Sequence, residues 1–193
     1  EDLSYEPIQI SSFTNNVNTV EKGNTINTIT FNWSINKIPV ELTLNGNPID
    51  TVMHSTTITD IITGNTTYIL RAVDEKDAVS TRTSSVSFVN GVYYGVGESI
   101  NIGQMTSSFI RGLQKRLSSS AKFTFSVSAG IDEYIYFACP SSYSQPSFYV
   151  GGFEGGFELL ESFKFTNQYQ YTENYNIYVS TNANLGDTTV ECK

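Results

Sequence analysis

The chain has few of the residues on which most enzyme and metal sites depend. Its 193 residues include one histidine, two cysteines and one tryptophan. A Ser-His-Asp or Cys-His arrangement would have to use His54, and no activated nucleophile is expected beside it. One histidine and the two distant cysteines, Cys139 and Cys192, cannot build a closed zinc site, and no acidic loop has the spacing of a calcium site. We therefore expect no catalytic residue, no metal site and no cofactor.

Charge is also scarce. Charged residues make up 16% of the chain and the net charge is −8, against roughly 25% charged residues in an average soluble domain. Nucleic-acid binding needs clustered Lys and Arg, and the one such cluster, Arg111, Lys115 and Arg116, is expected to be a solvated helix face. No apolar run approaches the roughly 20 residues of a membrane span. Neither a nucleic-acid partner nor membrane insertion is expected.

Two weaker signals for chemistry have structural explanations. A paired-carboxylate mechanism needs only two acids, and Glu154, Glu158 and Glu161 lie near aromatic residues. Placement in loops and on strand surfaces explains these acids better. The glycine pairs of residues 151–156 lack the Lys-Ser or Lys-Thr and the helix of a phosphate-binding loop, so they predict a bulged or sharply turned pair of strands. A disulfide between the two cysteines stays an open alternative.

Aromatic residues, by contrast, are abundant, with 12 Tyr and 12 Phe. They gather in the apolar run Glu133–Pro140 and in residues 147–150 and 157–165. Strands of this kind, separated by Pro and Gly rather than by helix caps, are typical of an antiparallel β-domain. The sequence therefore predicts an all-β protein.

The first half, residues 1–90, predicts a β-sandwich. Residues 25–35 alternate with period two, which places Ile29, Phe31 and Trp33 on one buried face. A further strand over residues 40–44 ends in an Asn-Gly turn. About seven short strands at such spacing are typical of an immunoglobulin-like sandwich.

Trp33, together with Ile62, Thr66 and Tyr68, resembles the pattern of fibronectin type III and related immunoglobulin-like modules. The resemblance covers residues 8–89. It implies that Trp33 is a core tryptophan and that Tyr68 forms a tyrosine corner, so both are expected in the core rather than on a ligand platform.

The second half, residues 91–193, predicts a β-rich domain that follows without a long linker. Residues 105–117 show the one helical stripe of apolar side chains, and Gly112 weakens it. Residues 122–128 alternate as a strand. We expect an antiparallel domain with one short helix that covers its core.

A second resemblance lies in this half, in residues 133–136, 150–153 and 172–175. They resemble the C-terminal β-domain of bacteriophage virion proteins, where it follows an immunoglobulin-like module. The resemblance implies a non-enzymatic tail, baseplate or fibre component that is assembled in the host cytoplasm and acts in assembly or host attachment. It implies as partners other virion proteins, copies of the chain itself (a homo-oligomer such as a trimer) and a host-surface glycan or protein.

The candidate binding residues are aromatic: Tyr143, Tyr149, Phe153, Tyr169 and Tyr171. Tyrosine gives a large contact area at low entropic cost and has a polar tip. Two interpretations compete, contact with a sugar or receptor and burial between copies of the chain, and we favour the second. The alternative function is that of a bacterial surface adhesin or carbohydrate-binding module at the cell surface.

Overall fold

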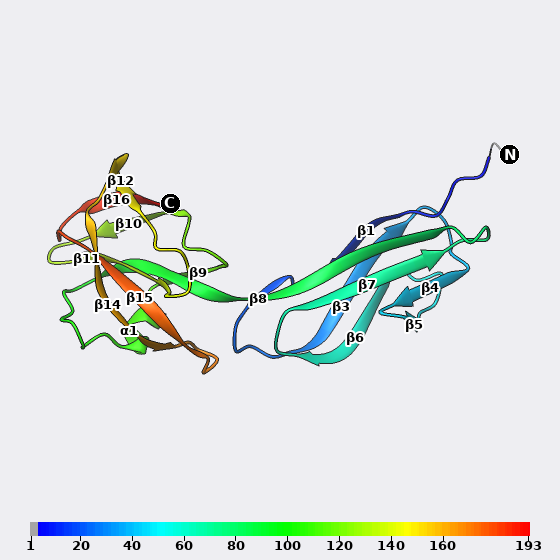
Figure 1. Cartoon of the computed structure of the whole chain (residues 1–193), viewed down its shortest axis with the longest axis horizontal. Coiled ribbons are helices and arrows are strands. Elements are labelled where there is room, and N and C mark those ends of the chain that lie inside the picture. The colour runs from blue at the N-terminus through cyan, green and yellow to red at the C-terminus, as the bar shows by residue number, and fades with distance from the viewer. Residues whose placement is uncertain (1–3) are drawn as a thin grey trace. The chain divides into compact units, whose positions relative to one another are not determined.

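The computed structural model describes residues 4–193 as almost entirely β-structure with one short helix (Figure 1). The predicted all-β class is confirmed. Two compact units make up the chain, one of residues up to 20 and 24–88, the other of residues 21–23 and 89–193. Residues 1–3, with which the predicted first domain begins, lie outside the described residues.

The first unit is a sandwich of two antiparallel sheets. One sheet has the strand order β1-β3-β6, and the other has the order β5-β4-β7-β8. Three strands facing four is an immunoglobulin-like architecture, as predicted. A short further strand, β2, pairs with β8. The strands are β1 (Ile10–Asn15), β2 (Thr19–Glu21), β3 (Ile26–Ile35), β4 (Glu41–Leu44), β5 (Asn47–Pro48), β6 (Ser55–Ile62), β7 (Thr66–Val73) and β8 (Val79–Gly97).

Alternation along β3 builds the core of this sandwich. Phe31 is fully buried and its ring lies 5.3 Å from that of Phe13 and 4.8 Å from that of Tyr68. Trp33 and Tyr68 are both buried, which confirms their predicted place in the core. The Tyr68 hydroxyl donates to the Asp60 carboxylate at 3.2 Å, and burial followed by this bond raises the pKa of Tyr68 to about 12. The hydroxyl of Tyr68, the predicted corner tyrosine, thus has a side-chain carboxylate as its hydrogen-bond acceptor.

Two tight hairpins turn on residues with positive φ. Asn45 and Gly46, with φ of 48° and 79°, join β4 to β5. Gly151 and Gly152, with φ of 59° and 84°, join β12 (Phe148–Val150) to β13 (Phe153–Glu154). Two-residue turns with both φ values positive match the twist of the strands that they join, and glycine adopts this conformation without strain. Both predicted turns are confirmed.

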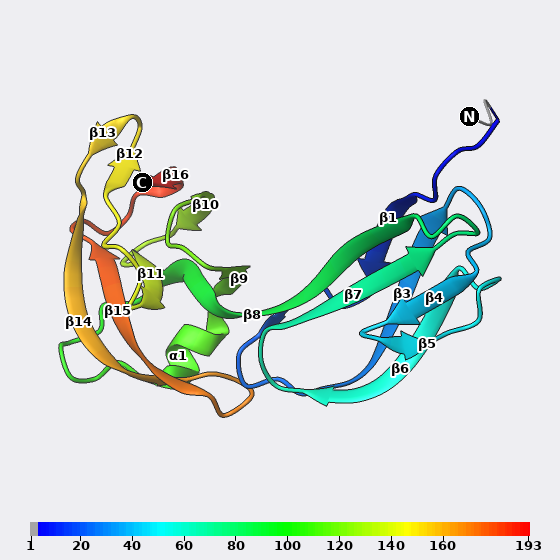
Figure 2. The same cartoon turned by 45° about the vertical axis from the view of Figure 1, so that its right-hand side comes forward.

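The second unit contains two antiparallel sheets and a helix. One sheet has the order β14-β15-β11-β8-β9, with β9 attached to β8, and the other has the order β10-β16-β12-β13. Figures 1 and 2 show the two sheets as separate layers. The remaining elements are α1 (Ser107–Gly112), β9 (Gln114–Ser118), β10 (Thr124–Ala129), β11 (Tyr134–Pro140), β14 (Phe157–Thr166), β15 (Thr172–Ser180) and β16 (Gly186–Cys192).

Strand β11 lies at the centre of the second unit because both of its faces are covered. Ile135 and Phe137 point into the core between the two sheets, whereas Tyr136 and Ala138 point into the core that α1 covers. A strand buried on both faces is apolar at nearly every position. This explains the continuous apolar run at residues 133–140 in the sequence.

The predicted helix over residues 105–117 is wrong in its length. Helix α1 spans only Ser107–Gly112, and residues Gln114–Ser118 form β9, which pairs with β8 from Tyr94↔Gln114 to Asn90↔Ser118. Pairing with a long neighbouring strand outweighs the weak helical preference that remains beyond Gly112. The helix covers the core through Ile110, as expected. Lys115 and Arg116 lie on β9, so the predicted basic helix face is also wrong.

Candidate functional site

The β12–β13 hairpin brings together two of the five predicted aromatic residues. Tyr149 pairs with Glu154, and Val150 pairs with Phe153. Phe153 is 80% exposed. Tyr149 is half-buried, and the Lys193 ammonium lies 4.4 Å from the centre of its ring. The hairpin is therefore an aromatic projection with one cation beside it.

A cavity of about 210 Å³ lies at the base of this hairpin. Two stacked rings, Phe148 and Phe157, form part of its wall, with centroids 4.5 Å apart and planes 16° apart. The exposed side chains of Glu154 and Gln145 supply polar groups. Ligand pockets for drug-sized molecules are larger, roughly 300–1,000 Å³. Aromatic walls with a few polar groups in this volume suit one sugar ring or one side chain.

The other three predicted residues lie elsewhere. Tyr143 is half-buried against the core between the sheets and donates its hydroxyl hydrogen to the Ser118 carbonyl at 2.5 Å. Burial raises the pKa of Tyr143. Tyr169 and Tyr171 lie in the connection between β14 and β15, about 40% exposed. The five residues therefore occupy three separate places in the second unit.

Tyr169 and Tyr171 pack against the segment of residues 21–23. A Cβ atom on Gly23, whose φ is +90°, would lie 2.7 Å from the Cβ of Tyr171 and 3.1 Å from that of Tyr169. Asn167 accepts the backbone N–H groups of both tyrosines and donates its amide to the Lys22 carbonyl at 2.7 Å. Only glycine fits at position 23. Tyr169 and Tyr171 thus lie against a segment of the chain's own backbone.

Glu21, next to this contact, is a buried acid that the sequence analysis did not single out. Its side chain is 3% exposed and accepts hydrogen bonds from the Tyr93 hydroxyl at 2.9 Å, the Lys115 ammonium at 2.6 Å and the Gln168 amide at 3.2 Å. Burial, followed by the bond to Glu21, raises the pKa of Tyr93 far above its ordinary range. These partners lie 72 to 147 residues away in the sequence, so no local pattern could have indicated the cluster.

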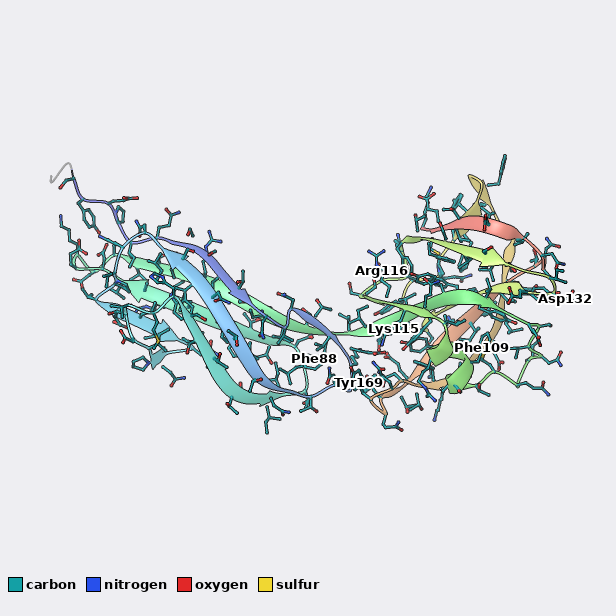
Figure 3. The ribbon with its side chains drawn as sticks, turned by 180° about the vertical axis from the view of Figure 1, so that it is seen from behind. Phe88, Phe109, Lys115, Arg116, Asp132 and Tyr169 are labelled. Carbon is teal, nitrogen blue, oxygen red and sulfur yellow. The ribbon has the colours of Figure 1, made fainter. Side chains whose placement is uncertain are left out.

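A cavity of about 230 Å³ adjoins the Glu21 cluster, lined by Tyr93, Arg111, Leu113, Lys115 and Gln168. Both cations on its wall have oxygen partners, Lys115 with Glu21 and Arg111 with the Thr166 carbonyl at 2.7 Å. Figure 3 labels Lys115 and Tyr169, which lie on the same side of the second unit. The arrangement is that of an internal ion pair, with its charges already satisfied.

The residues considered for catalysis or metal binding are dispersed. Within residues 4–193, no group of three or more His, Cys, Asp or Glu side chains comes together as a metal site. His54 lies in the loop before β6, where its carbonyl accepts the Trp33 N–H at 3.0 Å. Glu161 accepts the N–H groups of Gly103 and Met105, so it holds the segment before α1. No helix between residue 4 and residue 193 is long and apolar enough to cross a bilayer.

Cys139 and Cys192 are free thiols, which answers the open question of a disulfide. Both are buried in the core between the two sheets of the second unit. Burial raises the pKa of each thiol to about 12, and for Cys192 the nearby Cys139 and Glu191 add to this. Buried thiols of this kind act as small apolar side chains.

No protein-family model matches the sequence, and no curated protein matches it. One solved structure, that of the N-terminal eight Ig domains of Down Syndrome Cell Adhesion Molecule (isoform 1.30.30), shows 7% identity and a TM-score of 0.28 over 90% of this chain and 22% of that one. The fold assignment given above rests on the chain's own strand order.

Proposed function

We propose that the chain is a non-enzymatic structural component of a bacteriophage virion, in the tail, baseplate or a fibre, that acts in assembly or host-surface attachment. The resemblance of residues 133–136, 150–153 and 172–175 to virion β-domains motivates the proposal. Its localisation would be the virion, and its partners would be other virion proteins and further copies of itself.

The observation that carries this proposal is the continuity of β8. Residues 79–86 pair with β7 in the first unit, and residues 90–97 pair with β9 and β11 in the second, all within one 19-residue strand. Successive modules of a load-bearing assembly must transmit force along the backbone. A strand that is hydrogen-bonded into a sheet at each end is suited to that task, whereas a flexible linker is not.

Immunogold electron microscopy tests the proposal. Antibodies against the purified chain would be applied to phage particles purified from the organism that encodes this chain, with pre-absorbed antibody as the control. We expect gold at one defined place on the particle, at the tail or its fibres. Particles that carry no label, together with label on the bacterial surface, would overturn the virion assignment in favour of an adhesin.

The cavity beside the β12–β13 hairpin favours a second candidate, a carbohydrate-binding module of a surface adhesin. Glu154 lines the cavity, whereas Glu158, also exposed and only four positions away, does not. On a glycan array, the Glu154→Ala variant should no longer bind a sugar that the unsubstituted chain binds, whereas the Glu158→Ala variant should still bind it. Equal binding by both variants would exclude this cavity as the sugar site.

A further inference from the structure

Strand β10 has an open edge. It lies at the end of the four-stranded sheet of the second unit, and among residues 4–193 only β16 pairs with it (Figure 2). The pairing is regular from Thr124↔Glu191 to Ala129↔Gly186, without a bulge. Unpaired backbone groups at a sheet edge are a template for another strand.

The alternation of hydrogen-bonded and non-hydrogen-bonded residue pairs between β10 and β16 shows which backbone groups of β10 face this open edge. The Cys192 N–H donates to the Phe123 carbonyl at 3.0 Å, so Phe123 and Cys192 form a hydrogen-bonded pair. Hydrogen-bonded and non-hydrogen-bonded pairs alternate in an antiparallel ladder. Thr124, Ser126 and Ser128 therefore direct their N–H and C=O groups away from β16, and their side chains are exposed.

The other sheet edges have the features that prevent edge-to-edge pairing. Strand β14 carries charged residues and a bulge between Leu159 and Glu161, and β9 carries Lys115 and Arg116. Strands β5 and β13 are two residues long, β2 has only three residues and includes Glu21, β1 is bulged, and β6 contains Asp60. The β10 sequence, Thr-Phe-Ser-Val-Ser-Ala, has no charge, no proline and no glycine. Within the described residues, β10 is thus the edge without such protection.

We propose that β10 is an assembly edge that pairs antiparallel with β10 of a second copy of this chain, about a two-fold axis at Ser126. This inference deepens the proposed function, which requires contacts between copies, by naming the surface. With the axis at Ser126, Thr124 of one copy faces Ser128 of the other, so every residue with outward backbone groups meets another such residue. Three pairs form, each exchanging two hydrogen bonds. The two four-stranded sheets would become one of eight strands.

Charge favours a second copy as the occupant. Each copy carries a net charge of −8, which opposes most contacts between copies, yet β10 itself is neutral. Lys122 lies just before β10 and Asp132 lies in the turn just after it, so antiparallel pairing brings the end of one strand that carries a base toward the end of the other strand that carries an acid. The two-fold axis repeats this attraction. No like charges oppose one another along the strand.

Charge substitution at the axis tests the proposal. Ser126→Lys places two ammonium groups directly opposite each other, and so does Ser126→Asp with two carboxylates, whereas a mixture of the two variants restores attraction. Thr189→Lys is the matched control, because Thr189 is the exposed β16 partner of Ser126 and lies one strand in from the edge. Each variant loses the same hydroxyl–hydroxyl contact of 2.8 Å.

Sedimentation velocity over a concentration series is the measurement. We expect the unsubstituted chain and Thr189→Lys to self-associate. Each Ser126 variant alone should self-associate at least about tenfold more weakly. A mixture of Ser126→Lys and Ser126→Asp should associate more strongly than either variant alone. Association that Ser126→Lys leaves unchanged would overturn the β10 edge while leaving the virion proposal intact. A chain that stays monomeric at all concentrations would also overturn it.

A cross-link fixes the register. The Cα atoms of a hydrogen-bonded pair lie about 5.5 Å apart, within the range of about 4.4–6.8 Å for a disulfide. Ser126→Cys should therefore form a covalent dimer on mild oxidation, and Thr189→Cys should not. The native cysteines are buried and do not compete. Equal cross-linking of both variants would contradict the proposed register. Absence of gold on virions would reject the function without affecting this result.

Discussion

Glu21 and Lys115 are 94 residues apart in the sequence, and their carboxylate and ammonium groups lie 2.6 Å apart in the second unit. The Glu21 side chain is almost fully buried, whereas that of Lys115 is 30% exposed. The acid therefore depends on its partner more than the base does, because a buried carboxylate without a cation keeps its full desolvation cost. The pair holds residues 21–23 in the second unit.

Removal of the cation should be more harmful than removal of both charges. Lys115→Met leaves Glu21 buried with only the Tyr93 and Gln168 bonds, and we expect a loss of about 1–3 kcal/mol in the free energy of unfolding. Adding Glu21→Gln to Lys115→Met should recover part of this loss. Urea unfolding of the single and double variants measures the free energy of unfolding of each. Equal stabilities of the two would contradict the greater dependence of Glu21 on its partner.

Asp74 should make the first unit sensitive to acid. Its carboxylate is fully buried and accepts hydrogen bonds from the Tyr5 hydroxyl and from three backbone N–H groups, with the Lys37 ammonium 3.1 Å away. Burial alone would raise the pKa of Asp74, but the bonds from Tyr5, Lys76, Lys37 and Ala78 outweigh it and hold the pKa far below 3.8. The stabilisation is thus complete above pH 3.8 and lost as pH falls below it.

Asp74→Asn tests this acid dependence, with the exposed Asp77→Asn as control. Thermal unfolding at pH 7 should show a lower Tm for Asp74→Asn and little change for the control. Below pH 3.8 the difference between Asp74→Asn and the unsubstituted chain should shrink. A difference that is the same at pH 7 and at pH 2.5 would show that the carboxylate charge is not responsible.

The buried thiols predict low reactivity and alkaline sensitivity. Ellman's reagent at pH 8 should leave Cys139 and Cys192 unmodified in the folded chain and modify both in guanidinium. Because each pKa is raised from 9.0 to about 12, the folded state is favoured below pH 9 and loses that advantage as pH rises toward 12. The loss approaches about 1.4 kcal/mol per pH unit for each thiol. Cys192→Ala should reduce this slope, and an unchanged slope would contradict it.

Phe137 should be the most sensitive position of the core between the two sheets of the second unit. It is fully buried, and four rings lie within 6.4 Å of its own: Phe123, Phe125, Phe148 and Tyr178. Phe137→Ala should lower the free energy of unfolding by about 3–5 kcal/mol. Phe153→Ala, at an 80% exposed position, is the control and should change it little. Similar losses for both would contradict the core assignment.

Local patterns in the sequence were enough to predict the sandwich. Alternation along residues 25–35 correctly places Ile29, Phe31 and Trp33 in one core. The Asn-Gly and Gly-Gly pairs correctly indicate tight turns, because these residues adopt the positive φ values that such turns require. These features depend on neighbours within a few residues. The apolar run at 133–140 is similarly informative, because a strand covered on both faces is apolar at nearly every position.

Features set by distant partners could not be predicted in this way. The helix ends at Gly112 because Gln114–Ser118 pair with β8, a contact that no helical stripe reveals. Tyr143 was expected at the surface, yet it is half-buried and bonds to Ser118, 25 residues away. Glu21 gave no local signal, since its three partners come from β8, β9 and the β14–β15 connection.

The boundary between the two units has a consequence for how such a chain can be cut. The backbone passes between the units three times, after residues 20, 23 and 88, so the second unit is not one continuous segment. A truncation that starts at Val89 would leave Tyr93, Lys115 and Gln168 without Glu21. Recombination at residue 88 would therefore transfer an incomplete unit, and the two halves should be inherited together.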